Sequence, residues 1–210
     1  LMLRRGCNVF FKENCEYDKE EKIAQWVAER IGHYKVAKLT IDCIGVGSGV
    51  ASQLRTMGLG RKIIHWKSND SPVGKKAAKD FFNIRAQAYW FVKQLFYNSN
   101  IALTYENEDE LLTGQLTTIR VFPYRDQVII ESKKDMMKRS MPSPDDADAL
   151  VLCFSNDLKN KQIELSETVK NFRPVKESSV HPFMRADTGI VPPSSPTTKF
   201  GMIRTSSWRI

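Results

Sequence analysis

The stretch Lys38–Val50, with the sequence KLTIDCIGVGSGV, joins a run of apolar and β-branched residues to three closely spaced glycines. This pattern predicts a buried strand over Lys38–Cys43 and, after the glycines, a helix over Ser48–Met57. Ligands of open α/β sheets gather at the carboxyl ends of strands, so Asp42 is a candidate functional residue. A purely structural role for Asp42, in helix capping or loop hydrogen bonding, stays open. The glycines lack the G-x-G-x-x-G spacing of a dinucleotide-binding loop.

Strands and helices alternate on both sides of this stretch, which predicts an α/β domain with a mixed sheet flanked by helices. We expect strands over Leu1–Arg5, Asn8–Lys12 and Lys62–Trp66, a hairpin of Thr117–Phe122 and Gln127–Glu131 around residues 123–126, and helices over Asp18–Gly32, Lys75–Tyr97, Asn107–Leu116 and Pro144–Phe154.

The composition is that of a globular protein with a polyanionic partner. Of the 210 residues, 41% are hydrophobic and 27% are charged, which excludes a fully disordered chain. No apolar run approaches the roughly 20 residues that span a bilayer, so we expect no membrane contact. The formal net charge of +8 favours a polyanion as partner. The four cysteines form no C-x-x-C pair, which does not favour a zinc site.

The last fifth of the chain differs from the rest. Residues 171–210 contain six basic and two acidic residues, with five prolines among serines and threonines. This composition predicts that residues 161–210 form a basic, Pro/Ser-rich tail that is flexible and disordered. The folded domain is therefore expected to cover residues 1–160.

A cluster of acids begins the last predicted helix, in the sequence SPDDADALVL over Ser143–Leu152. Asp145 and Asp148 are three residues apart, so their carboxylates share one face of the helix. Two carboxylates this close repel each other unless a cation neutralises them, and hard divalent cations take such oxygen ligands. The alternative is that acids simply stabilise a helix amino terminus. We expect Asp146 to be a solvated residue with only that second role.

The segment Glu131–Arg139, ESKKDMMKR, places four cations between the hairpin and the acidic helix. A run of charges is most often a solvated face. Beside an acidic cluster, however, these cations suit a phosphate-bearing substrate. Lys133, expected at the end of the hairpin strand and nearest the acids, is the candidate for a phosphate or transition-state contact.

The segment Phe81–Trp90, FFNIRAQAYW, has aromatic residues at helical spacing. Such residues could stack on bases, but they more often form a core. Asn83 and Arg85 are the polar exceptions in this segment.

Four motifs of this chain together resemble the carboxy-terminal nuclease domain of the large terminase subunit of tailed bacteriophages and their prophages. The motifs occur in order as D-x-x-G-x-G-x-G-V over Asp42–Val50, F-x-N-x-R-A-x-x-Y-W over Phe81–Trp90, E-S-K-K-D-M over Glu131–Met136 and S-P-D-D-A-D-A-L over Ser143–Leu150. The resemblance covers about residues 1–157.

The resemblance implies a ribonuclease H-like fold and a metal-dependent DNA endonuclease that cuts concatemeric viral DNA with two Mg²⁺ or Mn²⁺ ions. Asp42, Asp145 and Asp148 match the metal-binding acids of the family, and Lys133 would steady the phosphate. The cations expected to contact DNA are Arg85, Lys134, Lys138 and Arg139.

One element of the family pattern is not found. The family's first strand carries an acid, whereas Leu1–Arg5 has none and matches the second strand better. No Walker-type G-x-x-x-x-G-K-[ST] motif of the family's ATPase motor occurs either. We therefore expect an amino-terminally truncated nuclease domain whose first strand is missing.

The resemblance implies double-stranded DNA as the main partner, with the portal protein and the small terminase subunit as further candidates. The implied location is the host cytoplasm, transiently at the portal of the procapsid. Two other readings stay open: another ribonuclease H-like nuclease, such as a junction resolvase, or a non-catalytic fragment that binds DNA or docks to a portal.

Overall fold

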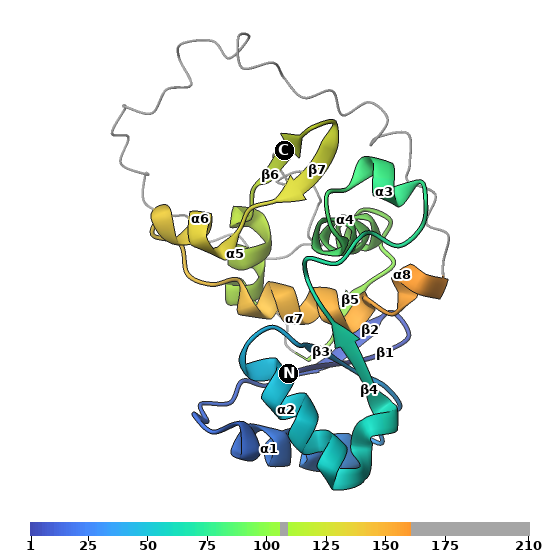
Figure 1. Cartoon of the computed structure of the whole chain (residues 1–210), viewed down its shortest axis with the longest axis vertical. Coiled ribbons are helices and arrows are strands. Elements are labelled where there is room, and N and C mark those ends of the chain that lie inside the picture. Colours follow the sequence, from blue (N-terminus) through green and yellow to red (C-terminus); the bar gives the residue numbers. More distant parts are fainter. Residues whose placement is uncertain (106–108, 161–210) are drawn as a thin grey trace, which may run out of the picture. The chain divides into compact units, whose positions relative to one another are not determined.

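The computed structural model describes residues 1–105 and 109–160, in which short strands alternate with helices (Figure 1). The tail expected over residues 161–210 lies outside the described residues. The strands are β1 (Met2–Arg5), β2 (Asn8–Lys12), β3 (Leu39–Asp42), β4 (Ile63–Trp66), β5 (Ala102–Leu103), β6 (Val121–Tyr124) and β7 (Gln127–Ile130). The helices are α1 (Glu20–His33), α2 (Val46–Leu54), α3 (Ala77–Asp80), α4 (Ile84–Tyr97), α5 (Glu110–Thr118), α6 (Lys133–Lys138), α7 (Asp145–Phe154) and α8 (Asp157–Asn160). Within this part of the chain no helix has the length and apolar character that crossing a membrane requires.

The strands confirm a mixed α/β arrangement but form three small sheets in the described part of the chain. β1 pairs with β2 antiparallel and β2 with β5 parallel, whereas β3 pairs with β4 parallel and β6 with β7 antiparallel. β1 and β3 each have one edge that pairs with no described strand. Residues of both strands line a cavity of about 750 Å³, so the first two sheets do not join there.

Helices α1 and α2 pack together over β3. Glu20 and Glu21 lie in the first turn of α1, and Arg30 lies in its last turn, where each charge interacts favourably with the helix dipole. The inward face of α1 carries buried residues at helical spacing, which pack with residues of β3 and α2. This core consists of Ala24, Trp26, Val27, Ile31, Leu39, Val50 and Leu54.

The helix predicted over Lys75–Tyr97 is interrupted, so the prediction of one continuous helix was wrong. α3 ends at Asp80, and α4 begins only at Ile84 because Asn83 caps it. The Asn83 side chain accepts a hydrogen bond from the backbone N–H of Ala86 at 2.9 Å, as an N-cap residue does. Tyr89 and Trp90 of α4 are buried, as expected for a core, and so is Phe91, whereas Tyr97 at the end of the helix is 73% exposed.

The hairpin of β6 and β7 has a tighter turn than the sequence suggested. Its turn residues are Arg125 and Asp126, with φ values of 48° and 66°, the left-handed conformation that two-residue hairpin turns require. Pro123 and Tyr124, expected in the turn, belong to β6 and pair with β7.

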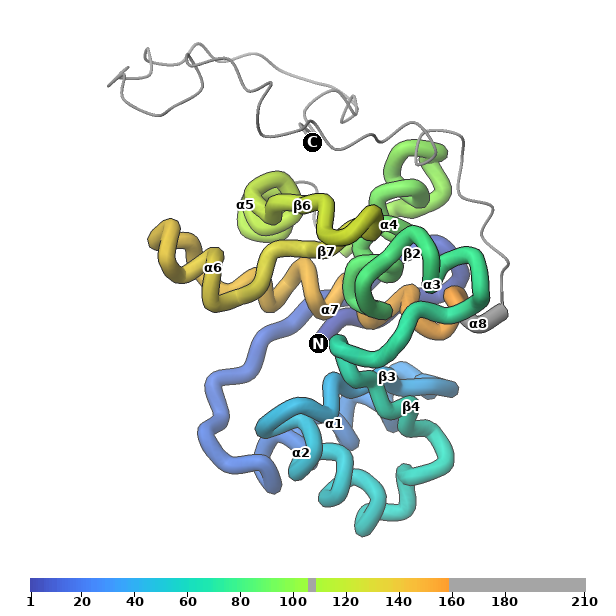
Figure 2. Tube along the Cα trace, turned by 45° about the horizontal axis from the view of Figure 1, so that its top comes forward, coloured from blue at the N-terminus to red at the C-terminus, as the bar shows by residue number. Residues whose placement is uncertain are grey.

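Helix α7 links the two halves of the described structure. It packs against α4 and α5 and also against β1 and β3. Figure 1 shows α7 between these groups, and Figure 2 shows it between α5 and β3. Its apolar face is buried as expected, with Ala147, Leu150, Val151 and Phe154 at most 3% exposed. This packing holds the amino-terminal acids of α7 near the ends of α4 and β7.

Candidate active site

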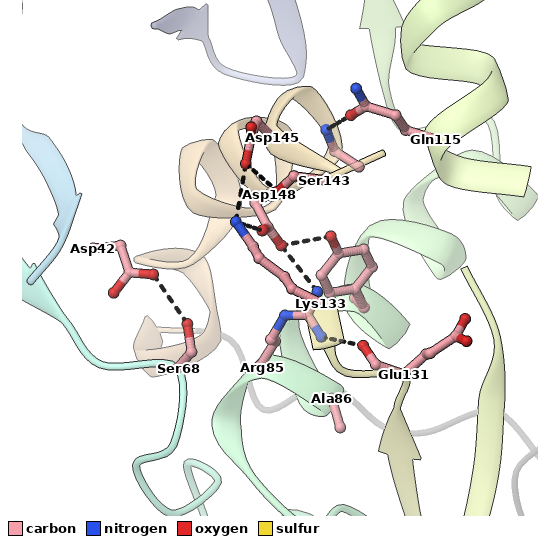
Figure 3. A network of polar contacts seen from close by, with 12 residues as sticks. Asp42, Ser68, Arg85, Ala86, Gln115, Glu131, Lys133, Ser143, Asp145 and Asp148 are labelled. Carbon is pink, nitrogen blue, oxygen red and sulfur yellow. Dashed lines mark hydrogen bonds and ion pairs between the residues drawn. The ribbon is translucent and has the colours of Figure 1, made fainter. Parts of the chain in front are cut away.

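Asp148 lies in the first turn of α7 and receives donors from two other helices (Figure 3). Its Oδ1 accepts hydrogen bonds from the Tyr89 hydroxyl at 2.6 Å and from Nη2 of Arg85 at 3.2 Å, both on α4. Its Oδ2 lies 3.1 Å from Nζ of Lys133 on α6. The side chain is 23% exposed, so this carboxylate is fixed by contacts while one side stays accessible.

Lys133 joins Asp148 to Asp145. Its Nζ donates to Oδ1 of Asp145 at 2.9 Å, and the same oxygen accepts from the Ser143 hydroxyl at 2.7 Å. The two carboxylates that the sequence placed on one helix face therefore converge on one cationic group.

The environment of Lys133 differs from the sequence prediction in one respect. Lys133 does not end a strand but is the first residue of helix α6, which Ser132 caps by accepting a hydrogen bond from the N–H of Asp135 at 3.2 Å. The pattern Ser-x-x-Asp is a capping signal that could have predicted this helix.

The protonation states of this cluster follow from its contacts. Burial alone would lower the pKa of Lys133, but the hydrogen bond to Asp145 and the charge of Asp148 raise it above its ordinary value. Burial would raise the pKa of Asp145, but the hydrogen bonds from Ser143 and Lys133 lower it. Burial and the charge of Asp148 raise the pKa of Tyr89 well above its ordinary value. At neutral pH, Lys133 is therefore a cation, Asp145 an anion and Tyr89 a hydrogen-bond donor.

Asp42 ends β3 and is held by its own neighbours. Its Oδ1 accepts from the backbone N–H of Ile44 at 3.3 Å, and its Oδ2 accepts from the Ser68 hydroxyl at 3.3 Å (Figure 3). The loop hydrogen bonding that was left open as an alternative is thus present. No ion pair or hydrogen bond between described residues joins Asp42 to Asp145 or Asp148.

Asp42 is nevertheless in the neighbourhood of α7. The Ser155 hydroxyl at the end of α7 donates to Oγ1 of Thr40 at 3.3 Å, and Asp42 and Ala149 line the same cavity. The structure thus brings Asp145 and Asp148 together and leaves Asp42 as a separate carboxylate. Across residues 1–105 and 109–160, no group of three or more His, Cys, Asp or Glu side chains is arranged to hold a metal ion.

Two of the four cations predicted to contact DNA form hydrogen bonds with other residues of the protein. Arg85 donates to the backbone carbonyl of Glu131 at 2.8 Å as well as to Asp148. Arg139 donates to both carboxylate oxygens of Glu131, at 2.8 and 2.6 Å, and this hydrogen bonding lowers the pKa of the buried Glu131. DNA contact by these two arginines stays a prediction, and several of their N–H groups already donate to protein oxygens.

The other two predicted DNA contacts, on helix α6, are exposed. Lys138 forms an ion pair with Asp135 at 2.7 Å in which both side chains are more than half exposed. Lys134 is also exposed and forms no ion pair with another described residue. Both side chains are therefore accessible to a polyanion.

Asp146 is not the solvated residue that the sequence suggested. It is 5% exposed, and its Oδ2 lies 2.8 Å from Nζ of Lys12, which also contacts Asp109 at 2.7 Å. The reason is that this side of α7 faces α5 and β2: the N–H of Ala147 donates to the Gln115 side chain at 2.9 Å. No local sequence signal connects Asp146 to a lysine 134 positions earlier.

Tyr89 was predicted only as a core aromatic residue, and its contact with the site was not predicted. The ring is buried, but the hydroxyl reaches Asp148. The spacing to Arg85 is the signal that was available, because residues four apart lie on the same helix face. Both side chains project from α4 toward the acid of α7.

The carboxylate oxygens of this cluster are suitable ligands for a hard divalent cation. Carboxylate oxygens of Asp145 and Asp148 already converge on one positive group, at 2.9 and 3.1 Å from Lys133 Nζ. Oxygen ligands from one or two carboxylates are typical of Mg²⁺ and Mn²⁺. The ammonium of Lys133 would have to leave this position if such an ion were bound.

The fold is similar to that of a nuclease domain of known structure. Among solved structures, the chain is similar to the nuclease domain of the large terminase subunit gp2 of the bacterial virus Sf6, in lysine-to-alanine variants. Identity is 21% for the structure with manganese and β-thujaplicinol (TM-score 0.64), 24% for that with manganese (TM-score 0.64) and 23% for that with calcium (TM-score 0.63).

The alignments cover 72% of this chain and 79–80% of the Sf6 domain. No protein-family model matches the chain, and no curated protein does. At this level of identity the likeness establishes the fold, and it confirms the predicted resemblance at that level.

Proposed function

We propose that this chain is a nuclease domain of a phage DNA-packaging terminase, a divalent-metal-dependent endonuclease that cuts concatemeric viral DNA. The observation that carries the proposal is the convergence of Asp145 and Asp148 on one cation position within a terminase nuclease fold. The Sf6 domains of the same fold were solved with manganese or calcium, which supports divalent-metal use.

In this proposal Asp145 and Asp148 would hold one Mg²⁺ or Mn²⁺ ion, and Asp42 would help to hold a second. When bound, a pair of such ions activates an attacking water and stabilises the leaving oxygen of a phosphodiester. The carboxylates supply charge that neutralises the ions. Lys133 moves its ammonium from Asp145 and Asp148 to a phosphate oxygen of the substrate, a shift that its half-exposed side chain permits.

DNA is held in this proposal through its phosphates. The net charge of +8 and the exposed lysines of α6, Lys134 and Lys138, supply sequence-independent attraction. Such a surface suits an enzyme that cuts many sequences. We further propose the portal protein and the small terminase subunit as partners, and action in the host cytoplasm and at the procapsid portal.

We also propose the finer fold assignment, a ribonuclease H-like sheet. In such a sheet one more strand, which is not among the described strands, would lie between β1 and β3. Three observations support it. Each of these strands has an edge without a described partner, both line the 750 Å³ cavity, and about a fifth of the Sf6 domain has no counterpart in the alignment. An extended segment in that place would pair with both edges and join two of the sheets.

Manganese uptake and DNA cleavage by the whole chain test the proposed activity. We expect calorimetry to detect Mn²⁺ binding by the parent chain, and Asp148→Ala and Asp42→Ala to weaken both binding and metal-dependent plasmid cleavage. Asp126→Asn, an exposed carboxylate in the hairpin turn, is the matched control and should change neither.

Failure of the parent chain to bind Mn²⁺ would contradict the nuclease proposal and favour a DNA-binding or docking role. A preference for branched over linear duplex would favour a resolvase-type nuclease instead.

A further inference from the structure

One face of helix α4 carries two polar side chains that meet at the same carboxylate oxygen. Tyr89 and Arg85 are four residues apart, and the Arg85 guanidinium lies over the Tyr89 ring, 4.9 Å from its centre. Both donate to Oδ1 of Asp148. The second terminal nitrogen of Arg85 donates to the carbonyl of Glu131, which fixes the guanidinium between β7 and α7.

We propose that Tyr89, supported by Arg85, is a positioning residue that turns Asp148 so that only Oδ2 is presented to a divalent cation. The proposal rests on the proposed function and deepens it, because it assigns a role to a side chain that does not itself touch the ion.

The count of acceptor positions supports this assignment. Each oxygen of an ionised carboxylate has two lone pairs, and the two donors from α4 occupy both on Oδ1. Oδ2 contacts only Lys133 among the described residues. This arrangement leaves Asp148 one oxygen for a metal ion, and Mg²⁺ sites commonly take only one or two carboxylates beside water and substrate phosphate.

The surroundings of Tyr89 keep its hydroxyl in place. The side chain is 7% exposed, and its ring is part of the aromatic core of α4. The hydroxyl cannot turn to bulk water without moving the ring, so it has Asp148 as its fixed acceptor. A phenylalanine at this position would keep the ring and lose only the hydrogen bond.

The experiment compares Tyr89→Phe with Tyr97→Phe in the full chain. Tyr97 is on the same helix but is 73% exposed, so its variant controls for the loss of a hydroxyl. Calorimetric titration with Mn²⁺ alone should give a dissociation constant about 10–100-fold higher for Tyr89→Phe, the usual effect of losing a partner of a metal ligand. Tyr97→Phe should bind as the parent does.

Two further readouts separate positioning from a general loss of structure. The ¹³Cγ chemical shift of Asp148 in the metal-free protein should change in Tyr89→Phe and not in Tyr97→Phe. Cleavage by Tyr89→Phe should recover as Mn²⁺ is raised, because the metal requirement shifts while the reacting groups stay. Arg85→Lys replaces the two terminal nitrogens that donate to Glu131 and Asp148 by one, and it provides a second variant with the same expected direction if Tyr89→Phe does not fold.

The outcomes are distinct. Equal Mn²⁺ affinity of Tyr89→Phe and the parent, or of Arg85→Lys where that variant must serve, overturns the positioning role and leaves the nuclease proposal standing. Absence of Mn²⁺ binding by the parent itself overturns both.

Discussion

The ammonium of Lys133 lies 3.1 Å from Oδ2 of Asp148, the oxygen of that carboxylate that Tyr89 and Arg85 do not bind. The same ammonium contacts Asp145. A side-chain cation thus occupies the position at which the proposed function requires a metal ion. This relationship makes the lysine both a competitor of the ion and a candidate partner of the substrate.

Lys133→Gln should therefore bind Mn²⁺ more tightly than the parent when DNA is absent, while cleavage falls. Partly exposed ion pairs are each worth about 0.2–1 kcal/mol, so losing two competing pairs should raise the affinity about 2–30-fold. Calorimetry with Mn²⁺ and a plasmid cleavage assay measure the two effects. Lys134→Gln, its exposed neighbour, should leave the Mn²⁺ affinity unchanged. An unchanged affinity for Lys133→Gln would show that the lysine does not compete.

Gly47 should tolerate no side chain. A Cβ added there would lie 1.8 Å from the backbone oxygen of Asp42, so the end of β3 must shift. We expect Gly47→Ala to lower the free energy of unfolding by about 1–3 kcal/mol, the usual cost of overpacking, and to weaken Mn²⁺ binding through Asp42. Gly114→Ala, in the interior of α5 with open space at the Cβ, should instead stabilise by about 0.5–1 kcal/mol. Urea unfolding of both variants tests the contrast.

Lys138 and Arg139, adjacent cations of the segment Glu131–Arg139, should differ in their effect on the free energy of unfolding. Arg139→Gln leaves Glu131, whose side chain is 2% exposed, without its cationic partner and should clearly lower the free energy of unfolding. Lys138→Gln removes an exposed pair and should lower it much less. Equal losses in thermal or urea unfolding would mean that the Glu131 pair is not effectively buried.

The same pair predicts how stability depends on pH. The hydrogen bond from Arg139 lowers the pKa of Glu131 in the folded state below its unfolded value of about 4.3. The pair's stabilisation is therefore fully present above that unfolded value and is lost as pH falls through the lower, folded value. Unfolding free energies measured from pH 7 to pH 3 should fall less steeply in Arg139→Gln than in the parent. Parallel curves would contradict this account.

The exposed lysines of α6 should control the salt dependence of DNA binding. Each lysine that neutralises one phosphate contributes about 0.9 to the slope of log K against log salt. Lys134→Gln should thus weaken duplex binding similarly for all sequences and reduce the slope by about that amount. Binding titrations at several salt concentrations measure the slope. A variant slope equal to that of the parent would place Lys134 outside the DNA contact.

Local patterns predicted the elements that lie beside the candidate site. The β-branched run ending at Asp42 gave a strand within one residue of β3, and the Pro-Asp-Asp start gave α7. The i, i+3 spacing of Asp145 and Asp148 predicted a shared helix face, and both carboxylates contact Lys133. These features depend on residues only a few positions apart. Hydrophobic periodicity and helix capping involve the same short range, so both can be recognised in the sequence.

Contacts between distant segments were not predictable in the same way. The burial of Asp146 depends on Lys12 and Asp109, and the hydroxyl of Tyr89 reaches an acid 59 residues further along the chain. The break between α3 and α4 was a different case, because the capping asparagine at 83 is a local signal that the apolar spacing of Lys75–Tyr97 concealed. The same cap orients the helix that carries both Arg85 and Tyr89.

Because Lys133 already balances two of the acids, the fold carries its own counter-ion at the place where repulsion would otherwise be greatest. A chelator should then return the melting temperature to that of the metal-free protein and not below it. In this account the domain is folded without metal and becomes active only when both metal ions and DNA bind.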